Sequence, residues 1–158
     1  MGELVTSKGL MSRLEGVRQN MSSVASELVV NAMGFLGVRY KYGGNDLEDG
    51  VDCSGFVRAI YEQTLGMVLP RRAAEQARAT QTISQDELKP GDLVFFNTMR
   101  SAFSHVGIYI GDNKFIHAPR SGAQVRIEDM RQSYWVKRFN GARRVDAGAG
   151  NIPLPLPR

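Results

Sequence analysis

The side chains best suited to covalent chemistry are one thiol and two imidazoles. Cys53 is the single cysteine of the 158-residue chain, and His105 and His117 are its two histidines. A thiol nucleophile needs a base within hydrogen-bond reach and a third group that orients the base. These three residues could therefore attack a carbonyl, with Cys53 forming the covalent bond and the histidines moving its proton.

The local sequence predicts where the thiol lies. Cys53 sits within the stretch DGVDCSGFVRAIY, residues 49–61. Asp52 is a good N-cap type, and the apolar residues from Val57 to Tyr61 recur at helical spacing, so we expect Cys53 at a helix N-terminus. The free backbone N–H groups at such an end favour an anion. They predict a lowered pKa for the thiol and a site for an oxyanion.

Two other uses of these residues stay open at this point. Free cysteine is among the most buried residue types, so Cys53 could be a small core side chain beside two structural histidines. One cysteine and two histidines could also hold a zinc ion with an open fourth position. The chain has no close pair such as C-x-x-C or H-E-x-x-H, so we expect no metal site and no cofactor.

The elements that must position these residues change type along the chain. Apolar residues at helical spacing predict a first helix that begins at Ser22 or Ser23 and stops by Gly37. The second helix should run from Asp52 to Gly66, and a short third helix should follow Pro70.

After these helices the pattern becomes that of strands. They are expected at LVFF (93–96), HVGIYIG (105–111), FIHA (115–118), QVRI (124–127) and RFNGARRV (138–145), with a short helical piece at EDMRQSYW (128–135). Helices followed by antiparallel strands predict an α+β fold. We expect its helices on one side of a sheet of about five or six strands.

The register of one hairpin decides whether the histidines can cooperate. Directly paired residues share a face of a sheet, and side chains alternate with period two. A two-residue turn at Asp112–Asn113 would pair Ile108 with His117 and place His105 on the opposite face. A three-residue loop would pair Tyr109 with His117, and this loop or an equivalent bulge would place both histidines on one face.

The bulk composition is that of one globular domain. The hydrophobic fraction is 42%, and 20 Lys and Arg against 16 Asp and Glu give a net charge of +4. The basic excess is densest late in the chain, but acidic residues are interleaved upstream and no nucleic-acid motif appears, so we expect no nucleic-acid partner. The expected boundaries are a loose arm at 1–20, a catalytic domain at 21–146 and a flexible Pro-rich tail at 147–158.

Five blocks of sequence carry a family resemblance. RYKYGG, DGVDCSGFV, LPRRAAEQA, LKPGDLVFF and SHVGIYIGDNKFIHA occur in the order and approximate spacing of the NlpC/P60 cysteine peptidases, which the chain resembles over about residues 30–145. The closing YWVKRFNGARRV is similar to Spr-type murein endopeptidases of that family. The resemblance implies a papain-like core that hydrolyses peptidoglycan stem peptides.

The resemblance also implies a role for each site residue. Cys53 matches the nucleophile, His105 the base, and His117 the polar residue that orients His105. Tyr40 matches a tyrosine whose hydroxyl helps form the oxyanion hole, with Tyr42 as the alternative.

Further residues would meet the substrate. Asp52 and Ser54 match residues of the substrate pocket that in some members hold the free amine of the stem peptide. Arg71 or Arg72 should face substrate carboxylates, and we assign this to Arg71. Plain surface charge is the alternative for both arginines.

Several functional choices stay open from the sequence. The cleaved bond is either the D-alanyl–diaminopimelate cross-link or the γ-D-glutamyl–diaminopimelate bond. A catalytically silent peptidoglycan-binding module and an acyltransferase or amidase on another amide or lipid are the rival functions. We expect a monomer in the cell envelope, periplasmic or lipid-anchored. Any export signal or attachment would lie in an N-terminal segment absent from this chain, because no apolar signal core is visible.

Overall fold

The computed structural model describes residues 23–146, so the expected arm at 1–20 and tail at 147–158 lie outside the described residues. The helices of the described part are α2 (Ser23–Met33), α3 (Cys53–Leu65), α4 (Ala73–Arg78) and α5 (Ser133–Arg138), with a 3₁₀ turn at Gln85–Glu87. Its strands are β1 (Asn45–Asp46), β2 (Gly50–Val51), β3 (Gln81–Ile83), β4 (Leu93–Phe96), β5 (His105–Gly111), β6 (Lys114–His117), β7 (Arg126–Asp129) and β8 (Phe139–Arg144). Within residues 23–146, no helix has the length and apolar content needed to cross a bilayer.

Six of the strands form one sheet in the order β3-β8-β4-β5-β6-β7, and each pair of adjacent strands in it is antiparallel. This confirms the α+β class and the expected number of strands. The sequence pattern missed β3 and the small β1–β2 pair, which are only three and two residues long. Strands so short show no alternation that a pattern could reveal.

The helix that carries the cysteine is bounded as expected. Asp52 is the N-cap of α3, and its side chain accepts a hydrogen bond from the Gly55 N–H. Gly66 ends the helix in the left-handed conformation, with φ of 70°, which glycine adopts without steric cost. The helix α2 ends at Met33, earlier than expected, and turns lead from there to Gly37.

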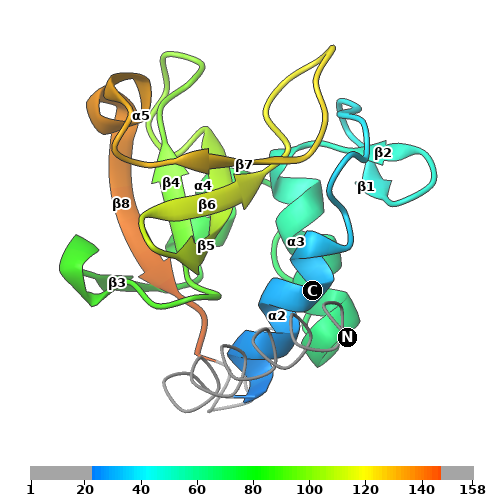
Figure 1. The fold of residues 1–158 in the computed structure, drawn as a ribbon, viewed down its shortest axis with the longest axis horizontal. Helices are drawn as coiled ribbons and strands as arrows, with labels where there is room; N and C mark the ends of the chain where they lie inside the picture. The colour runs from blue at the N-terminus through cyan, green and yellow to red at the C-terminus, as the bar shows by residue number, and fades with distance from the viewer. Residues whose placement is uncertain (1–22, 147–158) are drawn as a thin grey trace, which may run out of the picture.

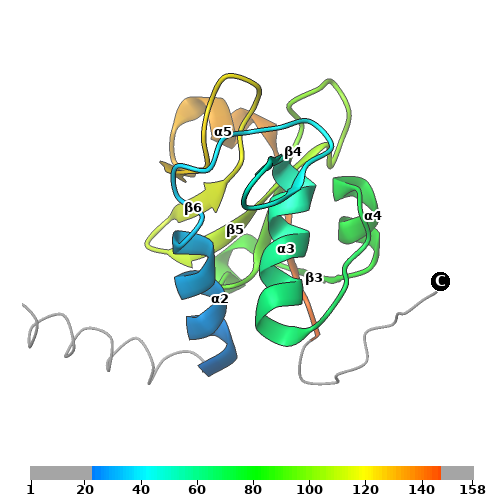
Figure 2. The same cartoon turned by 90° about the vertical axis from the view of Figure 1, so that its right-hand side faces the viewer.

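The N-terminal helices lie on one face of the sheet, as expected, and the short helix α5 helps to cover the other face. Figures 1 and 2 show α2 and α3 side by side against one face, where their apolar residues pack on Leu93, Phe95 and Ile108. The other face carries a second cluster in which Phe96, Phe115 and Trp135 meet, and Trp135 belongs to α5. Successive side chains of the strands LVFF and HVGIYIG point alternately into the two clusters. A continuous apolar run such as LVFF therefore contributes buried side chains to both faces of the sheet.

The β5–β6 hairpin combines a two-residue turn with a bulge. Gly111 pairs with Lys114 across Asp112 and Asn113, which both have positive φ. The register then shifts, so that Tyr109 pairs with Phe115 and Ile108 pairs with Ile116. The three-residue loop is therefore wrong, and the bulge performs the same task.

Candidate active site

The N-terminus of α3 brings Cys53 against the start of β5. Sγ of Cys53 lies 3.9 Å from the carbonyl oxygen of Ser104, the residue before His105, and the Val106 N–H also bonds to the sulfur. The thiol is partly buried and packs against the larger apolar cluster. Because Cys53 is the first residue of its helix, its own N–H has no carbonyl partner one helical turn earlier. That N–H is available to a ligand.

The two histidines lie on one face of the sheet and touch. Nε2 of His105 is 2.7 Å from Nδ1 of His117, and both side chains are buried. The bulge makes this contact possible, because it moves His117 onto the face that His105 occupies. Gly107 lies between them on that face. A Cβ there would come within 2.7 Å of Phe115 and 3.1 Å of the His117 Cβ.

The contact between the rings bears on the zinc alternative. Two nitrogens that bind one zinc ion lie about 2 Å from the metal in a tetrahedral arrangement, so they are well over 3 Å apart. The 2.7 Å separation is that of a hydrogen bond between the rings. Within residues 23–146, no three Cys, His, Asp or Glu side chains are grouped to hold a metal ion.

Glu128 joins the site, and the sequence analysis did not identify it. Its Oε2 is 2.9 Å from Nε2 of His117, and it also accepts hydrogen bonds from Arg126 and Trp135. The expected helical piece at 128–135 was placed too early, because β7 extends through Asp129 and α5 begins at Ser133. The alternation of Arg126 and Glu128 with Val125 and Ile127 was the available signal for a longer strand.

The pKa of the Cys53 thiol is raised, and the expectation that it is lowered is wrong. Burial raises the pKa of Cys53 to about 11, and hydrogen bonds from the backbone N–H groups of Val106 and Ser54 only partly oppose it. Burial also holds the pKa of His105 well below its usual value, and the neighbouring His117 adds to this. Desolvation therefore outweighs the helix N-terminus, and thiol and imidazole both rest uncharged.

Tyr40 lies near the thiol and keeps its proton. Burial raises the pKa of its phenol to about 12, and the nearby Cys53 and Asp52 act in the same direction. A protonated hydroxyl is a hydrogen-bond donor, as an oxyanion hole requires. The alternative, Tyr42, is 84% exposed at the rim of the site.

The residues expected to meet substrate bind one another in the described structure. The Arg71 guanidinium donates to both carboxylate oxygens of Asp52, at 3.1 Å each, and to the Ser54 hydroxyl at 3.0 Å. The N–H groups of Gly55 and Gly43 each donate to one of the same carboxylate oxygens. Asp52 thus caps the helix and offsets the charge of Arg71, and both of its oxygens are occupied.

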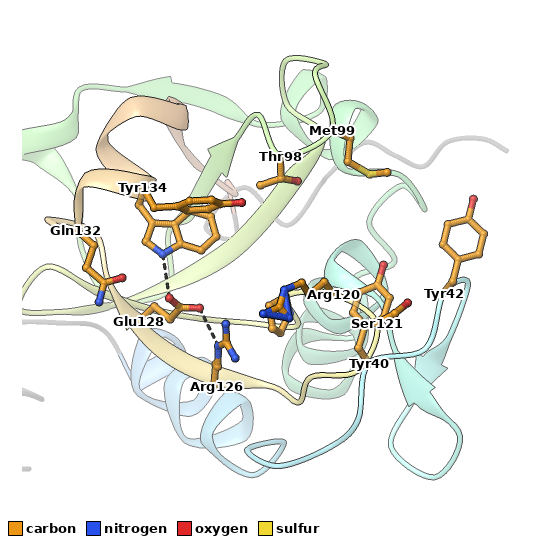
Figure 3. A pocket seen from close by; sticks show the side chains of 12 residues that line it. Tyr40, Tyr42, Thr98, Met99, Arg120, Ser121, Arg126, Glu128, Gln132 and Tyr134 are labelled. Carbon is orange, nitrogen blue, oxygen red and sulfur yellow. Dashed lines mark hydrogen bonds and ion pairs between the residues drawn. The ribbon is translucent and has the colours of Figure 1, made fainter.

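Two pockets adjoin along the site. One, of about 600 Å³, contains Cys53 and His105 together with Asp52, Ser54 and Arg71. The second, of about 680 Å³, is lined by Glu128 and by Arg120 and Arg126 (Figure 3). Residues common to both linings join the pockets, namely Tyr40, Tyr42, Thr98, Met99 and Pro119.

The sequence has curated relatives among bacterial wall and glutamyl peptidases. It is 43% identical over 122 residues to Murein DD-endopeptidase MepS/Murein LD-carboxypeptidase of Escherichia coli (strain K12), covering 77% of this chain and 63% of that protein. It is 39% identical over 129 residues to Gamma-DL-glutamyl hydrolase of Bacillus subtilis (strain 168), covering 81% of this chain and 30% of that protein. The chain therefore spans less than two thirds of the length of these relatives.

The structural comparison agrees with the sequence comparison. An NlpC/P60 family protein from Bacillus cereus ATCC 10987 superposes with a TM-score of 0.71 at 34% identity, covering 76% of this chain and 39% of the other. The sequence profile of the NlpC/P60 family matches residues 37–144, which include the thiol, both histidines and the whole sheet. The chain therefore belongs to the NlpC/P60 family.

Proposed function

We propose that the protein is a peptidoglycan endopeptidase that cleaves amide bonds of murein stem peptides with Cys53 as its nucleophile. The observation that carries this proposal is the position of the thiol, at the start of α3 and beside the hydrogen-bonded pair of His105 and His117. The relatives that cleave murein support the choice of substrate. Such a substrate would place the protein in the cell envelope.

The proposed reaction begins from an uncharged thiol and imidazole. His105 takes the proton of Cys53 as the sulfur attacks the amide carbonyl carbon, which forms the C–S bond and an oxyanion. The Cys53 N–H and the Tyr40 hydroxyl donate to this oxyanion. His105 then gives its proton to the leaving amine as the C–N bond breaks. Water, deprotonated by His105, hydrolyses the thioester and restores the thiol.

We infer that the D-alanyl–diaminopimelate cross-link is the bond that is cut. An enzyme that selects the free amine of a short stem peptide needs an unpaired anion in its pocket. Here Asp52 already binds Arg71 through both carboxylate oxygens, so this pair offers a substrate no net negative charge. A cross-link lies inside a longer peptide and needs no such anion.

The second pocket fits the leaving side of a cross-link. Because His105 must protonate the leaving amine, the residue that carries this amine belongs on the side of the site toward His117. The His117 ring binds Glu128, and Arg126 binds the same carboxylate. Arg120 lines the pocket that contains Arg126 and Glu128. In the cross-link, the carbon that carries the leaving amine also carries a carboxylate. The guanidinium of Arg120 has no hydrogen bond or ion pair to any residue of 23–146, so it is free to bind that carboxylate.

Digestion of purified murein, followed by mass spectrometry of the muropeptides, tests this function. We expect cross-linked dimers to become monomers that end in D-alanine, with no product cut at the γ-D-glutamyl bond. Cys53→Ala should be folded and inactive, and Cys53→Ser nearly so, since a hydroxyl is a weaker acid and a weaker nucleophile than a thiol. An added amine that accepts the acyl group would instead indicate the acyltransferase alternative. Binding of murein without turnover would indicate a silent binding module.

A further inference from the structure

A carboxylate lies directly behind the second histidine. His105, His117 and Glu128 form a chain of hydrogen bonds of 2.7 Å and 2.9 Å that leads away from Cys53. We propose that Glu128 is a positioning residue which, acting through His117, fixes the protons on both imidazole rings so that Nδ1 of His105 is bare and can accept the Cys53 proton. This proposal rests on the cysteine peptidase function proposed above.

The positions of the protons follow from what each atom can donate. Hydrogen bonds from His117, Trp135 and Arg126 lower the pKa of Glu128 to about 2, so its carboxylate only accepts. Nε2 of His117 must then carry the proton of that ring. Burial lowers the pKa of His117, so the ring is neutral and its Nδ1 accepts a proton from Nε2 of His105. His105 is also neutral, which leaves its Nδ1 unprotonated.

Without the carboxylate, the two rings would have no preferred arrangement. His117 could equally hold its proton on Nδ1 and donate it to Nε2 of His105. The distance between the rings would be the same, but the proton of His105 would then sit on Nδ1. Since Nε2 of His105 already faces His117, Nδ1 is the nitrogen left to serve Cys53, and a proton there would block it. Only a third group can distinguish these two arrangements.

Glu128 is itself held firmly for this task. Arg126 donates to Oε2 at 2.8 Å, a pair visible in Figure 3, and the Trp135 indole donates to Oε1 at 3.0 Å. The Trp135 ring also stacks on His105 at 5.8 Å and meets His117 edge-on at 5.1 Å. The Trp135 side chain thus orients the carboxylate and confines both imidazole rings. The three groups therefore have little freedom to move relative to one another.

The first test is nitrogen-15 NMR of the imidazoles in the unmodified protein at neutral pH. We expect both rings neutral, each with its proton on Nε2. A proton on Nδ1 of His105 would overturn the proposal. This measurement needs neither murein nor a variant. It therefore still decides the proposal if the protein cleaves no murein or if a substitution prevents folding.

The second test compares Glu128→Gln with a matched control. An amide can donate or accept, so both ring arrangements become accessible, and kcat on murein should fall about tenfold or more with KM unchanged. Loss of the negative charge should also move the acid limb of kcat/KM to lower pH, because Glu128 raises the pKa of His105 through its charge. Asp129→Asn removes the same charge from the next residue of β7, whose carboxylate binds Arg131, and should change neither quantity.

The comparison has an outcome that rejects the proposal. If Glu128→Gln keeps the ring protonation, the acid limb and a kcat within about twofold of the unmodified protein, Glu128 has no positioning role. A loss of activity accompanied by unchanged imidazole spectra would reject it as well, because such a loss would arise elsewhere.

Discussion

At the scale of single residues, His105 and His117 have different tasks in the proposed mechanism. His105 transfers protons, whereas His117 accepts from His105 and donates to Glu128. An amide side chain can perform both functions of His117, since its oxygen accepts and its NH₂ donates. No amide can replace His105, because an amide is not a base near neutral pH.

This difference predicts a graded series of variants. His117→Gln and His117→Asn should keep measurable kcat/KM, with a loss of about 10- to 100-fold, and His117→Ala should lose more. His105→Gln should be as inactive as Cys53→Ala. Circular dichroism should show that all variants are folded. Equal losses in the three His117 variants would mean that the imidazole itself is required there.

The proposed role of Arg120 predicts that the protein prefers substrates with a free carboxylate beside the leaving amine. A charge-assisted hydrogen bond to the carboxylate beside the leaving amine should contribute about 1.5 kcal/mol, or roughly tenfold in kcat/KM. Two cross-linked muropeptides, one with this carboxylate free and one with it amidated, provide the measurement. The unmodified protein should prefer the free acid, and Arg120→Gln should remove the preference while it hydrolyses the amidated substrate as before.

The control for this prediction is Arg78→Gln, which removes the same charge from the last turn of α4, outside both pockets. This variant should keep the preference for the free acid. A preference that survives in Arg120→Gln would mean that another group recognises the carboxylate.

At the scale of elements, the site depends on the narrow space between two strands. Gly107 has no side chain at the point where the histidine rings approach, and a Cβ there would lie 2.7 Å from Phe115 and 3.0 Å from the Ile116 carbonyl oxygen. Gly107→Ala must therefore push β6 away or tilt His117. A crowded core of this kind costs about 1 to 3 kcal/mol.

We expect Gly107→Ala to lose more activity than stability. A displacement of the His117 ring weakens the 2.7 Å contact with His105, and small misplacements of catalytic groups can cost about 100-fold in rate. Thermal unfolding and kcat/KM on the same preparation provide the comparison. A variant with full activity and a lowered melting temperature would show that the site tolerates movement of β6.

At the scale of the whole molecule, the buried titratable groups make stability depend on pH. Burial lowers the pKa of His105 and His117 in the folded state, so the unfolded chain binds protons first as the pH falls through about 6.5. The free energy of unfolding should therefore decrease below about pH 7. Glu128, with a folded pKa of about 2, adds stability that is present above its unfolded value and is lost as the pH falls below about 4.5.

Urea unfolding between about pH 8 and pH 5 tests the histidine contribution. Stability should fall steadily on acidification, and His117→Gln should show a shallower slope because one buried imidazole is missing. A stability that is constant or rises toward pH 5 would contradict the assignment of two neutral, buried rings.

The sequence by itself determined the elements with strong local signals. Asp52 and Gly66 bound α3, and the change from helical to strand periodicity predicted the α+β class, because capping and alternation are properties of a few neighbouring residues. The chemistry of the thiol and the two histidines made them candidates for the site, and the resemblance to the NlpC/P60 family implied their roles. The five blocks that resemble the NlpC/P60 family predicted the membership that the comparisons confirmed.

Only the tertiary structure decided where these residues lie relative to one another. The bulge in β5 sets the face on which His117 lies, and nothing in the local sequence distinguishes it from a regular turn. Glu128 reaches His117 only because β7 pairs with β6 over its full length. Burial raises the pKa of Cys53. Burial depends on all the groups that pack around the thiol in the folded protein, whereas the helix N-terminus that was expected to lower the pKa is a local feature of the sequence.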